Sequence, residues 1–371
     1  MALASGSPYY MPPASAKKMS VDLAVLPIWY AEAENDVLLP DERSVEWICQ
    51  GCRLTLPVVG VTRVEREYKR ISPWGWSPAL VHRLMELGVT SGETLMRSRV
   101  EILRRISSRY TAVSLLPKLQ GKFILGESVW LTSIDEVCKF SVQHDKVLLK
   151  APWSGSGKGL QSLTGLPDAN LYGWIRRIIA TQGGVVGEPF YHKIKDFAME
   201  FFASGKGVTF YGYSLFEADA RGIYKENVLT SDKCIEQVLS NYVPLSVLYD
   251  IREALLEELT LLLKDNYEGF LGVDMMIVRT AEGYAVHPCV EVNLRMNMGV
   301  VSRVFFDRYV SPDVSGRYVI EYYPQIGEAL KAHEAMCRLY PLIVKNGRIY
   351  KGYLSLTPVF EDTNYQIYVI V

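Results

Sequence analysis

GFLGVDMMIVRTAEGYAVHPCVEVNLRMNMG, residues 269–299, decides the fold, because its pattern predicts two β-strands joined by a tight turn. Glu282-Gly283 is the expected two-residue turn, since glycine adopts a positive φ without a steric penalty. With that turn, Asp274 and Glu291 oppose each other across the hairpin, with Cβ atoms about 4.5 to 5.5 Å apart. Two carboxylates at that spacing suit one shared divalent cation.

The second strand of this hairpin has a reactive face and a core face, because side chains alternate along a strand. The reactive face is expected to carry His287, Cys289, Glu291, Asn293 and Arg295, and the core face Val286, Pro288, Val290, Val292 and Leu294. Carboxylate and amide oxygens select Mg²⁺ or Mn²⁺ over zinc, and Mg²⁺ usually completes its shell with water and substrate phosphates. Asp274, Glu291 and Asn293 therefore predict a metal site beside a nucleotide. The alternative is an ordinary hairpin with a polar exposed face.

The composition fits a globular protein of two or three packed units. The chain has 371 residues, of which 49% are hydrophobic and 22% are charged, and its net charge is -1. This balance gives no electrostatic argument for binding nucleic acid or an anionic membrane. No apolar run approaches the roughly 20 residues that span a bilayer, and the N-terminus lacks a signal-peptide pattern. We therefore expect a cytoplasmic protein.

The six cysteines do not predict a disulfide framework. Cys49 and Cys52 form the only close pair, and no second pair follows at the spacing of a zinc site, so we expect reduced thiols and leave a redox or metal role open. Residues 1–20 are rich in Ser, Ala and Pro without periodicity, which predicts a poorly ordered leader.

Residues 20–106 predict a small α/β unit that forms one wall of a substrate pocket, because strand-like and helical patterns alternate there. Val21–Pro27 and Leu54–Val61 are apolar runs with β character, and Ser77–Leu87 has a helical pattern. Further elements are expected as a helix over 100–116 that Ser107 or Ser108 interrupts, a strand over 208–215, and an amphipathic helix over 251–264 with a core-facing leucine stripe.

The second informative stretch is KVLLKAPWSGSGKGL, residues 146–160, in which an apolar strand delivers Lys150 to the start of a Gly/Ser loop. Such a loop can wrap an anion with its backbone N–H groups, although it matches neither the Walker A pattern nor G-x-G-x-x-G. Alone, it is most often a solvated connection. The lysine is more informative, because a buried ammonium needs an anionic partner.

The motifs follow one another in a set order. A basic residue after a Ser-Ser turn, Lys150 before the Gly/Ser loop, Glu188, Asp196 and a long helix precede Asp274 and then Glu291-Val-Asn293-Leu-Arg295. This order resembles the ATP-grasp superfamily, which includes D-alanine:D-alanine ligases, glycinamide ribonucleotide synthetases and biotin carboxylases. The implied fold is α/β (α+β): residues 107–310 would form an ATP-grasp domain of two subdomains, residues 20–106 resemble the preceding α/β domain, and residues 311–371 would be a C-terminal extension.

The resemblance implies a role for each motif residue. Those implied to bind ATP are Arg109, Lys150, Ser154, Gly155, Ser156, Gly157, Lys158, Glu188, Phe190 and Asp196. Lys150 would bind the α and β phosphates, the 154–159 loop would close over the γ phosphate, the segment from Glu188 would hold adenine, and Asp196 would take the ribose hydroxyls. Those implied to hold Mg²⁺ or Mn²⁺, with two ions expected, are Asp274, Glu291 and Asn293.

Arg295 matches an arginine that supports phosphoryl transfer in several members. Two positions depart from the pattern, since Arg109 replaces a lysine found in most members and Gly272 replaces an arginine of the D-alanine ligases. The second departure places that particular substrate chemistry in doubt.

The implied activity is ATP-dependent ligation of a small carboxylate to an amine. Transfer of the γ phosphoryl to the carboxylate makes an acyl phosphate that the amine attacks, while Mg²⁺, Lys150 and Arg295 neutralise charge. The helix expected over 299–309 offers free N–H groups to a substrate carboxylate, with Ser302 and Arg303 as candidate contacts beside the alternative that they are only helix surface.

Two other functions stay open, namely a kinase-like phosphotransferase and a non-catalytic ATP-binding module, and so does a homodimer. Because opposed carboxylates repel without a metal, we also expect Glu291→Gln to leave the metal-free fold as stable or slightly more stable while it reduces turnover.

Overall fold

A computed structural model describes residues 2–51, 54, 56, 59–63, 71–89, 93–154, 159–218 and 224–371. The strands of these residues form one four-stranded sheet, one eight-stranded sheet and two separate pairs. The mixed α/β fold class expected from the sequence is confirmed, with a small parallel pair in the N-terminal unit and larger antiparallel sheets after it.

The N-terminal unit is built from short helices around a pair of parallel strands. Its elements are α1 (Ala2–Ser5), α2 (Ala14–Asp22), the 3-10 helix η1 (Leu26–Trp29), β1 (Asp36–Leu38), α3 (Glu42–Gly51), β2 (Val59–Val61), α4 (Pro78–Glu86) and α5 (Glu93–Ile106). Helix α4 begins where the sequence predicts, because the Ser77 side chain caps it and Pro78 occupies its first turn.

Two segments of this unit differ from their expected structure. Residues 1–20 carry α1 and α2 where we expected a poorly ordered leader, and α2 is held by Asp22, which accepts backbone N–H bonds from Asn364 and Tyr365 at 3.0 Å each. Val21–Pro27 belongs to α2, η1 and the residues between them, not to a strand. A short apolar run can bury its side chains equally well in a helical turn, so its composition does not decide between the two.

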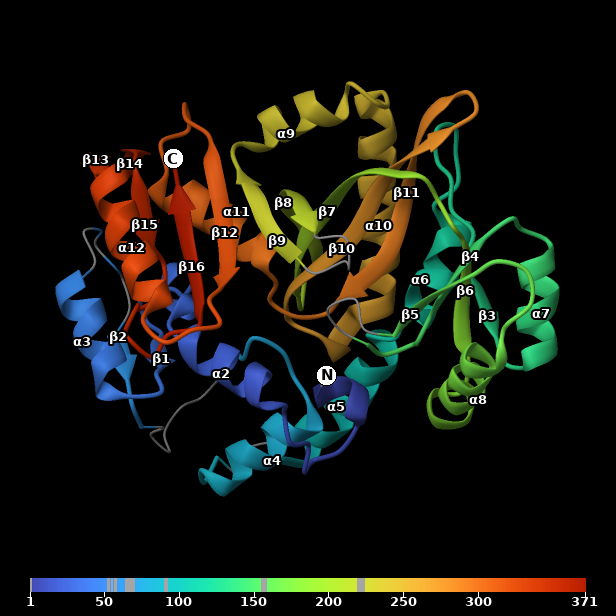
Figure 1. Ribbon diagram of the computed structural model, residues 1–371, viewed down its shortest axis with the longest axis horizontal. Helices are drawn as coiled ribbons and strands as arrows, with labels where there is room; N and C mark the ends of the chain where they lie inside the picture. The colour runs from blue at the N-terminus through green and yellow to red at the C-terminus, as the bar shows by residue number, and fades with distance from the viewer. Residues whose placement is uncertain are drawn as a thin grey trace.

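Helices cover one face of the four-stranded sheet, and the opposite face carries the buried side chains of Lys150 and Glu188. Between it and α5 lie α6 (Tyr110–Leu115) and η2 (Leu116–Lys118), so the predicted helix break near Ser107 and Ser108 is confirmed. The sheet order is β3 (Val129–Leu131), β6 (Val185–Pro189), β4 (Val147–Lys150) and β5 (Leu160–Leu163), all antiparallel. Helices α7 (Ile134–Val142) and α8 (Ala169–Gln182) lie with it at one end of the molecule in Figure 1 and pack on Leu149 and Val185.

The eight-stranded sheet crosses the middle of the molecule (Figure 1) in the order β11-β10-β7-β8-β9-β12-β16-β15. Its strands are β7 (Lys193–Ser204), β8 (Gly207–Ala218), β9 (Tyr224–Leu229), β10 (Gly269–Thr280), β11 (Gly283–Asn293), β12 (Gly316–Tyr322), β15 (Tyr353–Ser355) and β16 (Tyr365–Ile370). The remaining elements are α9 (Asp232–Leu239), α10 (Leu245–Leu263), η3 (Lys264–Asn266), α11 (Met298–Tyr309), α12 (Glu328–Leu339), β13 (Ile343–Lys345) and β14 (Arg348–Lys351).

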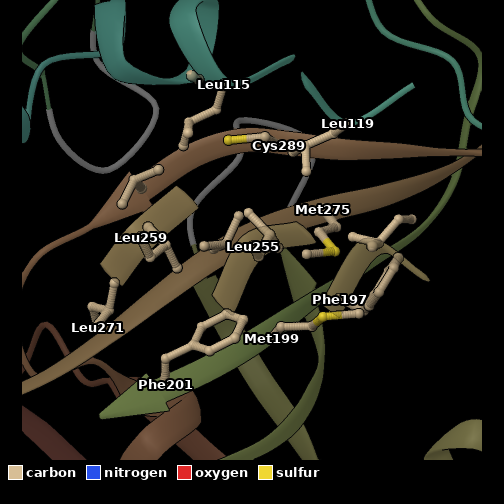
Figure 2. Packing of buried hydrophobic residues seen from close by; sticks show 14 of the residues in the cluster. Leu115, Leu119, Phe197, Met199, Phe201, Leu255, Leu259, Leu271, Met275 and Cys289 are labelled. Atoms are coloured by element: carbon tan, nitrogen blue, oxygen red, sulfur yellow. The ribbon is translucent and has the colours of Figure 1, made fainter. Parts of the chain in front are cut away.

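Helix α10 covers one face of this sheet. Figure 2 shows Leu255 and Leu259 of α10 beside Phe197 and Met199 of β7 and Met275 of β10, all of them buried. The predicted leucine stripe is therefore core. Because side chains alternate along each strand, the residues between these apolar positions point to the opposite face, which is polar.

The central hairpin differs from its predicted form at the turn. Thr280 pairs with Gly283, so the two-residue loop is Ala281-Glu282, one residue earlier than expected. A β-bulge follows, because β10 advances two residues from Asp274 to Met276 while the paired residues of β11 run from Glu291 back to His287. Regular pairing from the actual turn would set Cys289 opposite Asp274.

The bulge has two consequences for the predicted faces. Asp274 pairs with Glu291 as expected, although the turn that predicted this pairing is not the one that forms. Cys289, which was expected on the reactive face, is fully buried in the core, and Figure 2 shows it close to Leu115 and Leu119. The extra residues of the bulge break the strict alternation on which that expectation rested.

The C-terminal residues continue the eight-stranded sheet and complete the N-terminal core. Strand β12 pairs with β9 and β16, and Trp29 donates its indole N–H to the Leu356 carbonyl at 2.7 Å. Trp29, Tyr318 and Ile367 belong to one apolar cluster, so the two ends of the chain fold together. Among the described helices, none is long and apolar enough to cross a membrane.

Candidate functional site

Lys150 and Glu188 form a buried ion pair on the face of the four-stranded sheet opposite α7 and α8. The Lys150 ammonium lies 2.5 Å from one Glu188 oxygen, and the two side chains are 5% and 2% exposed. They are diagonal neighbours, since Leu148 pairs with Glu188 and Lys150 with Val186. The other Glu188 oxygen accepts a hydrogen bond from Ser128 Oγ at 3.2 Å. Lys150 therefore has the anionic partner that a buried ammonium needs.

His287 lies buried beside this pair, and sequence reasoning gave it no role. Its ring meets Tyr191 edge to face at 5.3 Å, and neither ring nitrogen has a hydrogen-bond partner. Burial lowers the pKa of His287 to about 4, with Lys150 acting in the same direction and Glu188 opposing it. The imidazole is therefore neutral at physiological pH.

Phe190 and Asp196 lie on the chain that leaves the four-stranded sheet for β7. Phe190 is 50% exposed, and the Lys146 ammonium lies 3.9 Å from its ring centroid. The Asp196 carboxylate accepts a hydrogen bond from Lys193 Nζ at 2.5 Å. Phe190 is therefore exposed and Asp196 partly buried; these are the residues predicted from the sequence to contact the base and the ribose of ATP.

Three neighbouring strands carry four carboxylates on the polar face of the eight-stranded sheet. Asp196 and Glu200 come from β7, Asp274 from β10 and Glu291 from β11. Asp274 lies opposite Ala198, midway between Asp196 and Glu200, and also pairs with Glu291. The two predicted metal carboxylates are thus brought together, and two more lie on the same face.

Burial and the neighbouring negative charges both disfavour the ionised form of Asp274. Burial raises the pKa of its carboxyl to about 7, and the negative charges of Glu291 and Asp196 act in the same direction. Arg295 and a hydrogen bond from Asn293 Nδ2 at 2.9 Å oppose the shift. A nearby divalent cation would lower the pKa of Asp274, because positive charge favours the ionised carboxylate.

Asn293 is the last residue of β11, and Arg295 lies just beyond the end of the strand. Arg295 donates from Nη2 to Asn293 Oδ1 at 3.0 Å and from Nη1 to the Met296 carbonyl at 3.2 Å. The amide oxygen expected to bind a metal is therefore occupied by a guanidinium.

Arg109 joins the two sheets. Its guanidinium contacts Glu291 at 3.0 Å, Ser154 Oγ at 2.5 Å and the Ala151 carbonyl at 2.7 Å, and the residue is 7% exposed. One buried cation thus connects a predicted metal ligand of β11 to the start of the Gly/Ser loop that follows β4. The predicted residues Gly155, Ser156, Gly157 and Lys158 lie outside the described residues.

Glu200 is a site residue that sequence reasoning missed. It is 1% exposed, and burial raises its pKa to about 8, although a hydrogen bond from Asn297 Nδ2 at 2.8 Å acts against that shift. Gly272 and Gly299 make room for it, since a Cβ on either would lie 2.5 or 2.2 Å from a Glu200 oxygen. The alternation Asp196, Ala198, Glu200 along β7 was the available signal.

Ser302 and Arg303, the candidate substrate contacts, are both buried in α11. Arg303 contacts Asp232 at 3.2 Å and the Thr230 carbonyl at 2.7 Å, and it also pairs with Asp307. Its donors therefore hold α11 against the segment between β9 and α9.

Asp274 and Glu291 fit a hard divalent cation. They oppose each other, and the pKa of Asp274 is raised mainly by burial, with the negative charge of Glu291 adding to the shift. The described residues contain no cluster of three or more His, Cys, Asp or Glu side chains that could hold a metal. Two opposed carboxylates are compatible with a Mg²⁺ site in which oxygens from outside the protein complete the shell.

No protein-family model matches the sequence, and no curated protein matches it. Among solved structures, the chain is similar to N5-carboxyaminoimidazole synthase from Aspergillus clavatus in complex with ADP and 5-aminoimidazole ribonucleotide, at 11% identity and a TM-score of 0.44, over 73% of this chain and 70% of that chain. It is also similar to N5-carboxyaminoimidazole synthetase from Staphylococcus aureus complexed with ADP, at 12% identity and 0.42, over 89% and 79%.

A third similar structure is an ATP-analogue complex of biotin carboxylase from Campylobacter jejuni, at 13% identity and a TM-score of 0.46, over 73% of this chain and 64% of that chain. Biotin carboxylases are among the ATP-grasp enzymes that the sequence motifs resemble. At these identities and TM-scores, the matches do not show what this chain binds or catalyses.

Proposed function

We propose that the protein is an ATP- and Mg²⁺-dependent enzyme that activates a small carboxylate for attack by an amine. One observation carries this proposal. Arg109 connects a buried cation site on one sheet, which contains Lys150, to a carboxylate site on the other, which contains Asp274 and Glu291. Phosphoryl transfer needs both kinds of charge at one place, with cations for the phosphate oxygens and carboxylates for a metal.

Lys150 is the proposed phosphate ligand. It lies at the end of β4, directly before the segment that leads into the Gly/Ser loop, and its ammonium already rests against Glu188. A nucleotide phosphate would share this ammonium with Glu188, so the lysine can stay buried and paired in both states. Phe190, Glu188 and Asp196 are the proposed contacts for the base and ribose, and Ser154 with the following loop for the γ phosphate.

Asp274 and Glu291 are the proposed metal carboxylates. A bound Mg²⁺ would supply positive charge to the phosphate oxygens. Arg295 donates to the Asn293 amide oxygen at 3.0 Å, and a metal ion bound at that oxygen would repel the guanidinium. Loss of this contact would free the Arg295 guanidinium to bind the transferring phosphoryl group, which is the role that we propose for it. Arg109 keeps Glu291 oriented.

The substrate carboxylate is proposed to bind near the start of α11, beside Ser302. Asn297 caps this helix, since its Oδ1 accepts a hydrogen bond from the Val300 N–H at 2.9 Å. The Nδ2 of the same amide donates to Glu200. We assign Arg303 to holding α11 in place, because Asp232, Asp307 and the Thr230 carbonyl engage its guanidinium.

ADP release from pooled small carboxylates and amines tests the proposal. The expected result is release that needs ATP, Mg²⁺, a carboxylate and an amine together, that is lost in Asp274→Asn and that is kept in Lys118→Ala. Lys118 is a suitable control because its exposed side chain pairs with Glu258. Release with an alcohol or phosphate acceptor and no amine would assign a phosphotransferase. ATP binding without ADP release from any pool would assign a binding module.

A further inference from the structure

A polar cluster lies in the C-terminal part of the protein, on elements other than those that carry the proposed ATP site. Cys337 and His333 are one helical turn apart on α12, with Cys337 Sγ 3.8 Å from His333 Nε2. His333 Nδ1 lies 2.8 Å from the Tyr353 hydroxyl of β15. Cys337 is exposed and belongs to no disulfide, whereas Tyr353 is 4% exposed. The cluster therefore runs from the core to the surface.

The direction of every hydrogen bond in this cluster follows from its buried end. Ser355 Oγ donates to the Thr357 carbonyl at 2.7 Å, so that oxygen can only accept from Gln366, which lies 2.9 Å away. The atom of Gln366 that faces Ser355 must then be its nitrogen, and the same nitrogen donates to the Tyr353 oxygen.

Tyr353 in turn fixes the tautomer of His333. Burial raises the pKa of the Tyr353 hydroxyl, so it keeps its proton. Because its oxygen accepts from Gln366, its own proton is available to His333 Nδ1, and a buried hydroxyl without an acceptor would lose the energy of one hydrogen bond. Nδ1 of the neutral imidazole is then an acceptor, and the ring proton sits on Nε2, which faces Cys337.

An N–H group that faces a sulfur stabilises the thiolate over the thiol. Burial lowers the pKa of His333, so the imidazole stays neutral where a thiol titrates. Two features oppose the thiolate, namely the last turn of α12, with its partial negative charge, and Glu334, whose carboxylate pairs with Arg338 at 3.9 Å. Glu321 of β12 is a third opposing feature, because its negative charge acts on Tyr353 of the cluster. The histidine donor counters all three.

We propose that Cys337 is a site of thiol–disulfide exchange with small disulfides, set up by the chain Ser355–Gln366–Tyr353–His333. In this step the Cys337 thiolate attacks one sulfur of the disulfide. A new bond joins Cys337 Sγ to that sulfur, the original sulfur–sulfur bond breaks, and the other half leaves as a thiolate that takes a proton from water. His333 acts as a positioning residue that donates a hydrogen bond.

The test measures how fast the full-length protein reacts with dithiodipyridine as a function of pH, without nucleotide. Peptide mass spectrometry follows the reaction of each cysteine separately. Cys49, also exposed, is the internal reference. His333→Asn keeps a group for Tyr353 at the Nδ1 position but has nothing at Nε2, whereas His333→Gln places an amide N–H near the Nε2 position. Tyr353→Phe keeps the imidazole and removes the proton that fixes its tautomer.

We expect the midpoint of the Cys337 profile to rise by about one pH unit in His333→Asn, to rise less in Tyr353→Phe and to stay unchanged in His333→Gln. The rate at pH 7 should fall only about threefold in His333→Asn, since a more basic thiolate is also a better nucleophile. The Cys49 profile should stay constant. Equal Cys337 midpoints in the wild type, His333→Asn and Tyr353→Phe would overturn the proposal. If His333→Asn does not fold, Tyr353→Phe and His333→Gln decide the matter alone.

Discussion

The two charged regions of the candidate site balance their charges differently. On the four-stranded sheet, Glu188 faces the ammonium of Lys150 at 2.5 Å, and the pair is closed to solvent. On the eight-stranded sheet, Asp274 and Glu200 accept hydrogen bonds from the neutral amides of Asn293 and Asn297. Their pKa values rise to about 7 and about 8 because burial is not offset by a close cation. The first region is paired within the protein, whereas added positive charge would stabilise the ionised carboxylates of the second.

The largest expected effect breaks the paired region. Lys150→Ala leaves Glu188 as an unpaired buried carboxylate, so we expect a loss of about 3 to 5 kcal/mol in the free energy of unfolding, together with loss of nucleotide binding. Urea unfolding measures the first effect and calorimetry with ATP and Mg²⁺ the second.

A double variant separates these two effects. Lys150→Met with Glu188→Leu replaces the pair by apolar side chains of similar size, so most of the stability should return. Nucleotide binding should not return, because the ammonium is still missing. A double variant that binds ATP like the wild type would show that Lys150 has only a structural role.

The next effect concerns pH and the second region. The pKa of Asp274 rises from 3.8 to about 7 on folding, so the folded protein holds this proton more tightly than the unfolded chain does. The contribution of Asp274 to the free energy of unfolding of the metal-free protein should therefore be largest below about pH 4 and fall as the pH rises to about 7. Glu200 acts in the same direction up to about 8. Mg²⁺ should restore stability at pH 8, and melting temperatures with and without Mg²⁺ measure this.

A smaller effect sets the two opposed carboxylates against each other. Asp274→Asn removes the charge that burial disfavours, so the metal-free protein should be as stable as the wild type or slightly more stable at pH 8. Glu291→Gln removes the negative charge that balances Arg109, a residue that is 7% exposed, and should cost about 1 to 3 kcal/mol. Because of the ion pair with Arg109, we now expect a cost in stability, where the sequence predicted that Glu291→Gln would leave the metal-free fold as stable or slightly more stable. Equal unfolding energies for the two variants would contradict this assignment.

The smallest effect is that of Asn297→Ala. This change removes the cap of α11 and the amide that holds Glu200, and we expect a cost of about 1 to 2 kcal/mol in the free energy of unfolding. Asn297→Ser keeps a capping oxygen and should recover about half of that cost. Urea unfolding of the two variants makes the comparison.

The sequence could predict the positions where chemistry is concentrated, because those residues stand out against apolar strands. Lys150 at the end of β4 and the Asp274–Glu291 pair were both found in this way. The pairing was right for an incomplete reason, since the turn lies one residue earlier and a bulge restores the register. No local sequence pattern predicts a bulge of this kind. The prediction therefore assumed regular alternation and placed Cys289 on the wrong face.

Long-range partners could not be predicted. Arg109 and Glu291 are far apart in the sequence, and only the meeting of the two sheets brings them to 3.0 Å. Likewise, Asp22 at the end of α2 accepts hydrogen bonds from the backbone N–H groups of Asn364 and Tyr365, near the other end of the chain. The composition of residues 1–20 does not show these partners, so it predicts a poorly ordered segment.

The central claim is that the acidic face binds a divalent cation with a nucleotide. Calorimetric titration of Mn²⁺ into the protein with a non-hydrolysable ATP analogue, at pH 8, tests it most directly when the wild type is compared with Asp274→Asn. The account predicts clear Mn²⁺ binding by the wild type, at least about tenfold weaker binding by Asp274→Asn, and unchanged binding by Lys118→Ala. Equal Mn²⁺ affinity in the wild type and Asp274→Asn would place the metal elsewhere and contradict the account.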